Sequence, residues 1–196
     1  MKRIFSLLLA AVMLLSLFSC DKKDAEEERE EPAYTASDIA ISTEHFSFTR
    51  AEVSYVFHKN YSDFKYNYPD SVDMYNIDTG STLKSQIYYD DYTWFKYFAD
   101  AATEYMEQLL VFCEGALTEG LELTDEDRED IDAAVRSWTD YAKDYAYTEK
   151  ELFGKFFNGD VTPDVMRSFM EKETLAVKYQ SLIASEYSFT DEELKS

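Results

Sequence analysis

Apolar side chains recur every three to four residues through most of the chain that follows residue 49. This spacing places them on one face of an α-helix and is typical of amphipathic helices that share a core. The pattern predicts five helical segments: one ending before Pro69, one at about 91–119, one from 125, one at about 149–157 and one from 163. We therefore expect a mainly α fold, a helical bundle of about five helices.

Start signals mark the beginnings of these segments. Thr49 and Glu52 form a capping box, in which each side chain binds the other residue's backbone N–H, and Thr148 with Glu151 repeats it. Pro163 stands at the first position of the last segment, where a missing N–H costs nothing. The predicted helix starts are thus supported by two signals, the capping residues and the period of the apolar side chains.

Two stretches do not follow the helical period. In the first, apolar and polar residues alternate, which predicts one or two short N-terminal strands. Its apolar positions are Ile39, Ile41, Phe46 and Phe48. The second, residues 69–90, is polar and rich in tyrosine and contains the turn-forming run Asp-Thr-Gly-Ser at 78–81. We expect this second stretch to be a long loop.

The N-terminus has the features of an export signal. Residues 1–19 begin with basic side chains and continue with an uncharged apolar run, which is shorter than a comfortable membrane span. Ser19 and Cys20 then resemble the lipobox of bacterial lipoproteins, in which the cysteine becomes the lipidated N-terminus. The alternative is an ordinary secreted protein with a chance cysteine at this position.

Three parts of the chain follow from this interpretation. Residues 1–19 are the predicted lipoprotein signal peptide, residues 20–36 the lipidated cysteine with an acidic tether, and residues 37–196 the helical domain. A tether with almost no apolar side chain cannot pack and reads as a solvated spacer. We expect the protein to be extracytoplasmic and anchored to the bacterial cell membrane through Cys20.

The charge of the chain is strongly acidic, with 40 Asp and Glu against 19 Lys and Arg and a formal net charge of −21. A phosphate backbone is bound through clusters of Lys and Arg, and no segment offers a basic stripe. Nucleic acid is therefore not expected as a partner.

The sequence shows no recognisable catalytic, metal or cofactor motif, and we expect no catalytic residue, metal or cofactor. Cys113 lies on an apolar helical stripe, which favours a buried, inert thiol. His45 and His58 are the two histidines of the chain, and we expect both to be surface or capping residues that precede the helical bundle.

Three segments, 91–98, 120–127 and 152–162, resemble the N-terminal, non-catalytic chaperone domain of SurA/PrsA-type peptidyl-prolyl isomerase foldases, and the resemblance covers about residues 42–195. It implies a helical domain that binds unfolded polypeptide and is usually followed by a parvulin isomerase domain. No residues follow 196 to form that domain, and Thr190 opens a capping box near the end. We therefore expect either that a following domain was lost or that the last residues fray.

The expected function is a membrane-anchored, extracytoplasmic, chaperone-like domain that binds unfolded or exported polypeptides without isomerase chemistry of its own. Tyrosine offers amphipathic contact area at a low entropic cost, which suits recognition of varied clients. The predicted client-binding residues are Tyr66, Tyr68, Tyr75, Tyr88, Tyr89 and Tyr92. The alternatives are a fragment or paralogue of a peptidyl-prolyl isomerase, or a lipoprotein that docks one specific partner.

Overall fold

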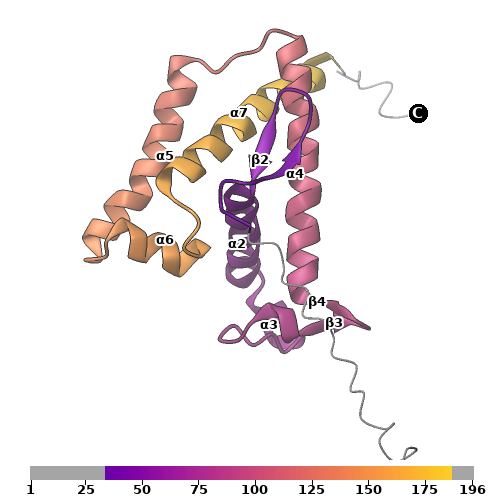
Figure 1. The fold of residues 1–196 in the computed structure, drawn as a ribbon, viewed down its shortest axis with the longest axis vertical. Helices are drawn as coiled ribbons and strands as arrows, with labels where there is room; N and C mark the ends of the chain where they lie inside the picture. Colours follow the sequence, from indigo (N-terminus) through magenta and orange to yellow (C-terminus); the bar gives the residue numbers. More distant parts are fainter. Residues whose placement is uncertain (1–33, 187–196) are drawn as a thin grey trace, which may run out of the picture. The chain divides into compact units, whose positions relative to one another are not determined.

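The fold is mainly α in the computed structural model, which describes residues 34–186 (Figure 1). Within these residues there are six α-helices: α2 (Arg50–Asn67), α3 (Pro69–Met74), α4 (Trp94–Thr118), α5 (Asp125–Asp144), α6 (Glu149–Phe157) and α7 (Pro163–Glu186). The predicted fold class is confirmed, since the five longer helices are the five predicted segments. The signal peptide, Cys20, most of the tether and the Thr190 capping box lie outside the described residues.

Threonine side chains cap the helices where the sequence indicated. Thr49 and Thr148 form the two predicted capping boxes, and Thr124 forms a third with Asp127. The Thr93 hydroxyl also accepts the backbone N–H of Lys96 at the start of α4. Each such cap contributes about 1 kcal/mol, so local chemistry sets where the helices begin.

Two short hairpins accompany the helices. The first joins β1 (Ile39–Ser42) to β2 (Ser47–Thr49) in antiparallel pairing, which confirms the predicted N-terminal strands. The second joins β3 (Ile87–Tyr89) to β4 (Tyr92–Thr93). No helix among the described residues has both the length and the apolar composition needed to cross a membrane.

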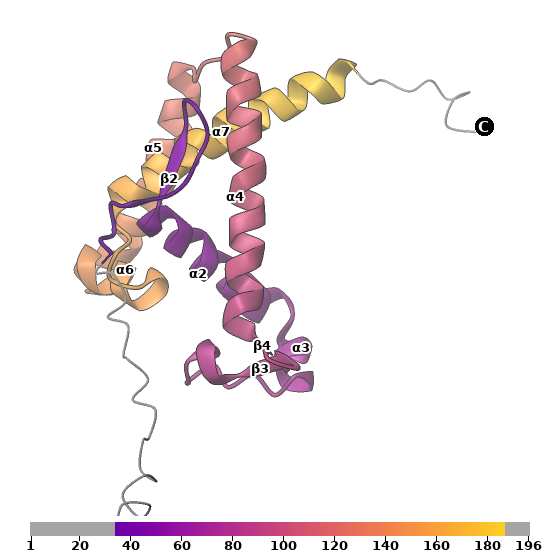
Figure 2. The ribbon, with the colours of Figure 1, turned by 45° about the vertical axis from the view of Figure 1, so that its right-hand side comes forward.

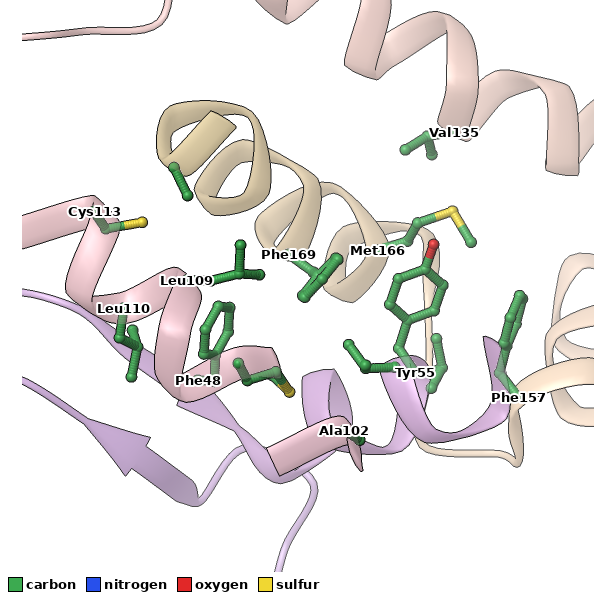
Figure 3. Packing of buried hydrophobic residues seen from close by; sticks show 14 of the residues in the cluster. Phe48, Tyr55, Ala102, Leu109, Leu110, Cys113, Val135, Phe157, Met166 and Phe169 are labelled. Atoms are coloured by element: carbon green, nitrogen blue, oxygen red, sulfur yellow. The ribbon is translucent and has the colours of Figure 1, made fainter. Parts of the chain in front are cut away.

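The main core lies where α7 packs against α4, α5 and α2 (Figures 1 and 2). Figure 3 shows side chains from β2, α2, α4 and α7 pointing toward one another in this core. Phe48 from β2 and Phe169 from α7 are almost fully buried, with their ring centroids 5.7 Å apart. The strand β2 is therefore held on the bundle by an aromatic anchor.

The prediction of a long loop at 69–90 is wrong. This segment contains α3, the 3-10 helix η2 (Leu83–Ser85) and β3. Ile77 and Leu83 from it are buried with Trp94 and Phe98 of α4 in a second, smaller core. These isolated apolar residues follow no helical or strand period, but both are buried in one cluster with the aromatic side chains of α4, and that packing orders the segment.

The start of α4 also differs from the prediction. The helix begins at Trp94 instead of about residue 91, because Tyr92 and Thr93 pair with β3 as a strand. Thr93 then serves as both the last strand residue and the helix cap.

At Gly115, α4 is in close contact with a side chain of α7. A Cβ atom built at this glycine would overlap the ring of Tyr179 on α7. Glycine costs an exposed helix about 1 kcal/mol relative to alanine. The position therefore gives up helix propensity so that a tyrosine ring can lie flat against the backbone.

We predict that Gly115→Ala destabilises the protein by about 1–3 kcal/mol, because overpacking outweighs the gain in helix propensity. In a Tyr179→Ala background the same substitution should be neutral or stabilising, since the ring is gone. Gly154→Ala is the matched control, because nothing lies within 4 Å of a Cβ at that helical glycine. Denaturant unfolding of the four variants measures these effects, and an equal cost of Gly115→Ala in both backgrounds contradicts the explanation.

Candidate functional site

The six predicted tyrosines lie at one end of the bundle, where α2 ends and α4 begins (Figures 1 and 2). Their positions follow the chain through this end: Tyr66 is in the last turn of α2, Tyr68 and Tyr75 flank α3, Tyr88 and Tyr89 are in β3, and Tyr92 is in β4. The fold thus brings six tyrosines from a stretch of chain between Tyr66 and Tyr92 into one region.

Ring contacts join four of the six predicted tyrosines. Tyr88 is the centre of this group, with ring centroids 5.9 Å from Tyr75, 5.2 Å from Tyr89 and 6.4 Å from Tyr92. A fifth ring, Tyr97 of α4, lies 5.3 Å from Tyr88 and was not among the predicted residues. We call these five residues the tyrosine surface.

The other two predicted tyrosines are not part of this surface. Tyr68 contacts Phe64 at 5.9 Å, and Phe64 in turn contacts Trp94. Tyr66 is 89% exposed, and no ring contact of it is found within residues 34–186.

The tyrosine surface is exposed but rigidly supported. Tyr75 and Tyr89 are 46% and 56% exposed, whereas Tyr88 is half-buried and lies 4.4 Å from the ring of Trp94, which is 3% exposed. The exposed rings are therefore in contact with the buried indole of Trp94, Tyr75 directly and Tyr89 through Tyr88. Such a surface can contact a partner with little loss of side-chain entropy, because its rings are already held in place.

The surroundings of this surface are acidic. Residues 66–100 contain six Asp and two Lys. The Tyr92 hydroxyl donates to Asp100 Oδ2 at 2.6 Å, and this hydrogen bond, followed by partial burial, raises the pKa of Tyr92 to about 12. The Lys96 ammonium lies 5.6 Å from the Tyr92 ring centroid, so a ring of this surface already receives a cation.

Gln86 orders the loop beneath the tyrosine surface. Its side-chain oxygen accepts the backbone N–H of Asp78 at 2.8 Å, and its amide nitrogen donates to the Asp78 and Thr82 carbonyls at 2.9 and 3.2 Å. Asp78 in turn accepts the backbone N–H of Gly80 and the hydroxyl of Ser81. The turn signal at 78–81 was visible in the sequence, but the distant amide that clamps it was not.

A groove of about 560 Å³ is lined by residues of this loop, of α2 and α4, and of the turn before α7. We call its apolar lining residues the floor and its polar lining residues the edges. The apolar lining residues are Val53, Phe57, Tyr61, Leu83, Phe95 and Ala99. The volume is within the range of small-ligand and peptide side-chain sites.

The two histidines have different surroundings. His45, at the tip of the first hairpin, is exposed and binds Glu114 of α4 through its backbone N–H and its Nδ1, both at 2.8 Å. This contact raises the pKa of His45, while bonds from Thr43 and His45 lower the pKa of Glu114 to about 2. His58 instead lies within α2, half-buried at the groove, where burial and then Lys65 lower its pKa. His58 is therefore not a capping residue, and it is only partly exposed at the groove.

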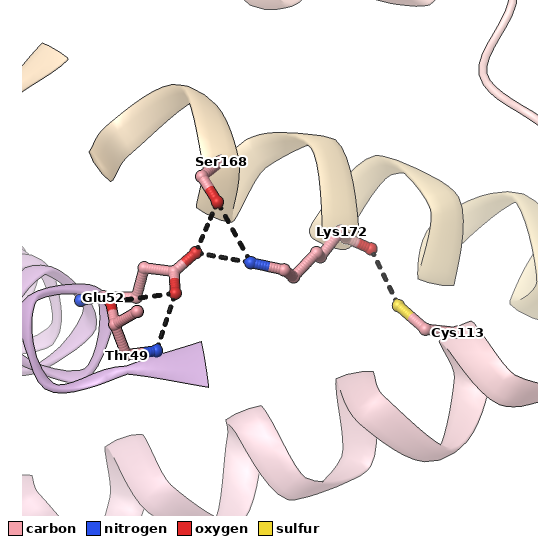
Figure 4. Close-up of polar contacts among 5 residues, drawn as sticks. All are labelled: Thr49, Glu52, Cys113, Ser168 and Lys172. Carbon is pink, nitrogen blue, oxygen red and sulfur yellow. Dashed lines mark hydrogen bonds and ion pairs between the residues drawn. The ribbon is translucent and has the colours of Figure 1, made fainter. Parts of the chain in front are cut away.

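A buried polar cluster joins α2 to α7 (Figure 4). Glu52, 1% exposed, accepts the Thr49 N–H and hydroxyl on one oxygen at 2.7 and 3.0 Å. Its other oxygen accepts Ser168 Oγ at 2.9 Å and Lys172 Nζ at 2.7 Å. The ammonium also donates to Ser168. A serine beside a lysine can be catalytic, but here both donate to a buried carboxylate, which is the geometry of a structural ion pair.

Cys113 lies next to this cluster and has the character that the sequence predicted. Its thiol is fully buried and donates to the Lys172 carbonyl at 3.3 Å. Burial raises the pKa of the thiol to about 11, so the reactive thiolate is scarce at neutral pH. In the described part of the chain, no three His, Cys, Asp or Glu side chains converge as metal ligands.

Comparisons with protein-family models, with curated proteins and with solved structures found no match for this chain.

We predict that Lys172→Met destabilises the protein by about 3–5 kcal/mol, because it leaves the Glu52 carboxylate buried and without its counter-ion. The double variant Glu52→Gln with Lys172→Met should lose less than the sum of the two single variants, since neither charge is then stranded.

The control for this prediction is Lys59→Met, which breaks the exposed ion pair with Asp63 and should cost at most about 1 kcal/mol. Urea unfolding monitored by circular dichroism gives all four values. If Lys172→Met costs no more than Lys59→Met, the buried cluster does not hold α2 on α7.

Proposed function

We propose that this protein is a membrane-anchored, extracytoplasmic, chaperone-like domain that holds unfolded or exported polypeptides and has no isomerase chemistry of its own. The proposal follows the resemblance to the N-terminal domain of SurA/PrsA-type foldases. The tyrosine surface is the observation that carries it, because it is an exposed aromatic area held rigidly on a buried tryptophan.

The ligand that fits this surface is an extended segment with aromatic or aliphatic side chains and with Lys or Arg. Tyr75 and Tyr89 are exposed to such a segment, and the neighbouring aspartates supply the opposite charge. Lys96 over Tyr92 shows within the chain how a cation is received. Contacts of this kind contribute about 1 kcal/mol each. The affinity of this surface for a single client segment is therefore low, and it depends little on the sequence of the client.

The residues present favour binding over catalysis. His45 is engaged by Glu114, and His58 lies on a different element, at the groove. Parvulin-type chemistry pairs histidines around a proline pocket, and within the described residues no contact joins these two. The proposal therefore assigns the chain a holding role.

The membrane anchor is proposed from residues 1–20 alone. A basic start, a short apolar run and a serine before Cys20 fit lipoprotein export. Each buried methylene contributes about 0.8 kcal/mol, so one acyl chain binds marginally whereas two hold a protein on a membrane.

We predict that Tyr75→Ser with Tyr89→Ser weakens client binding about 30-fold, since two contacts of roughly 1 kcal/mol each are lost. Light scattering of a denatured basic protein, with the chain added at equimolar ratio, measures aggregation, and anisotropy of a labelled client fragment measures affinity. Added salt should weaken the interaction with the basic client.

The matched control is Tyr141→Ser with Tyr145→Ser at the C-terminal end of α5, where the two tyrosines are 41% and 62% exposed. This variant should suppress aggregation as the unchanged protein does. The proposed holding role is contradicted if both double variants lose suppression of aggregation equally, or if the unchanged protein does not suppress aggregation. A pull-down that returns one stoichiometric folded partner favours a docking lipoprotein instead.

We predict that Cys20→Ala moves the protein from the membrane fraction to the soluble fraction and abolishes incorporation of labelled palmitate. Cys113→Ala, which removes the other cysteine, should leave both unchanged. Membrane retention of the Cys20→Ala variant excludes lipidation as the anchor.

A further inference from the structure

We propose that the groove between α2, α4 and the 78–86 loop binds an extended peptide segment in which a bulky apolar side chain stands next to an Asp or Glu. The proposal rests on the proposed function in one respect, that the ligand is a polypeptide. The site is separate from the tyrosine surface, and a different set of residues forms it.

The floor of the groove sets the length and polarity of the ligand. Val53, Phe57 and Tyr61 follow one another at every fourth position of α2, which spans about 12 Å. An extended chain rises about 3.3 Å per residue, so about four residues cover this distance. Phe95 of α4 and Leu83 of η2 complete the floor, and the Phe95 ring centroid lies 5.2 Å from that of Phe57. One or two apolar side chains of such a segment therefore find an apolar surface.

The edges of the groove favour a peptide over a plain hydrocarbon. Ser81 and Thr82 line it along the loop, and Asn158 lines it at the turn before α7. The Ser81 hydroxyl already donates to Asp78, the Thr82 hydroxyl accepts the Lys84 N–H, and Asn158 Oδ1 accepts the Gly159 N–H. The remaining donor and acceptor positions of these groups can bond the N–H and C=O groups of an extended backbone. An acyl chain would leave them without that partner.

The charge of the groove is opposite to that of the chain. Its charged lining side chains are Arg50 and Lys84, against one carboxylate, Asp160, whereas His58 adds no charge near neutral pH because burial lowers its pKa. Lys65 lies close by, with its ammonium 4.5 Å from the Tyr61 ring centroid. In a protein with about twice as many acids as bases, this local excess of cations points to an anionic group on the ligand.

Lys84 is the cation best placed for this role. Its ammonium lies 5.1 Å from the centroid of the Phe95 ring, which is part of the floor. Within residues 34–186, no carboxylate forms an ion pair with it. A Glu or Asp beside an apolar residue on Phe95 therefore meets a cation that has no carboxylate partner.

The test uses three fluorescent peptides that are identical except for one position next to a central leucine, where they carry Glu, Gln or Lys. Anisotropy with the full chain should give the order Glu, then Gln, then Lys in decreasing affinity. Lys84→Met keeps the apolar stem and should reduce the affinity of the Glu peptide by up to about five-fold, to that of the Gln peptide. Lys150→Met, which removes an exposed charge from α6, should leave the order unchanged.

A second variant, Ala99→Trp, fills the groove and should lower the affinity of all three peptides more than ten-fold, with circular dichroism and thermal unfolding confirming that it folds. The proposal is overturned if folded Ala99→Trp binds as the unchanged protein does, or if the Glu and Lys peptides bind equally. It is also overturned if Tyr75→Ser with Tyr89→Ser abolishes binding of the Glu peptide while the groove variants do not. Groove binding of the Glu peptide without suppression of aggregation supports the groove and contradicts only the holding role.

Discussion

The structure depends on the carboxylate of Glu52. It is almost fully buried, and both of its oxygens are occupied: one by Thr49 at the end of β2, the other by Ser168 and Lys172 on α7. A buried charge is costly unless it is paired and hydrogen-bonded, and here both conditions are met. One side chain thus fixes the first hairpin, α2 and α7 relative to one another.

That fixed position of α2 determines both candidate binding surfaces. The face of α2 that carries Val53, Phe57 and Tyr61 forms the floor of the groove, and further along the helix Phe64 packs on Trp94 beneath the tyrosine surface. The loop between them is ordered by the Gln86 clamp. This loop is therefore already ordered before a ligand binds at either surface. Such pre-organisation reduces the entropic cost of binding.

The five longer helices could be predicted because each depends on local chemistry. Capping threonines and a repeating apolar face lie within a few residues of one another, so a sequence window contains the whole signal. The ordered structure of residues 69–90 could not be predicted in this way. Ile77 and Leu83 are single apolar residues whose partner, Trp94, lies beyond the segment, and only the tertiary contact reveals their role.

The candidate surfaces, too, could be predicted from the sequence only in part. Tyrosine content marked the segment that carries the tyrosine surface, but Tyr97 was missed because it lies on a helix with many aromatic residues. Tyr66 was included although its ring is isolated within the described residues, since enrichment in sequence does not report contact. The groove was missed entirely, because the floor residues of α2 and α4 read as ordinary core positions and Leu83 lies in the segment predicted as a loop.

The opposite charges of the two surfaces are compatible with a strongly acidic chain. Charges in physiological salt act over about 8 Å, so a ligand in the groove senses Lys84 and its neighbours more than the distant acids. The net charge governs approach and solubility, whereas local pairs govern which side chains are held. A client with a basic stretch beside an acidic, apolar one would therefore match both surfaces at once. Binding two sites that share one loop also raises the effective concentration at the second site, so two weak contacts together can hold a chain that neither holds alone.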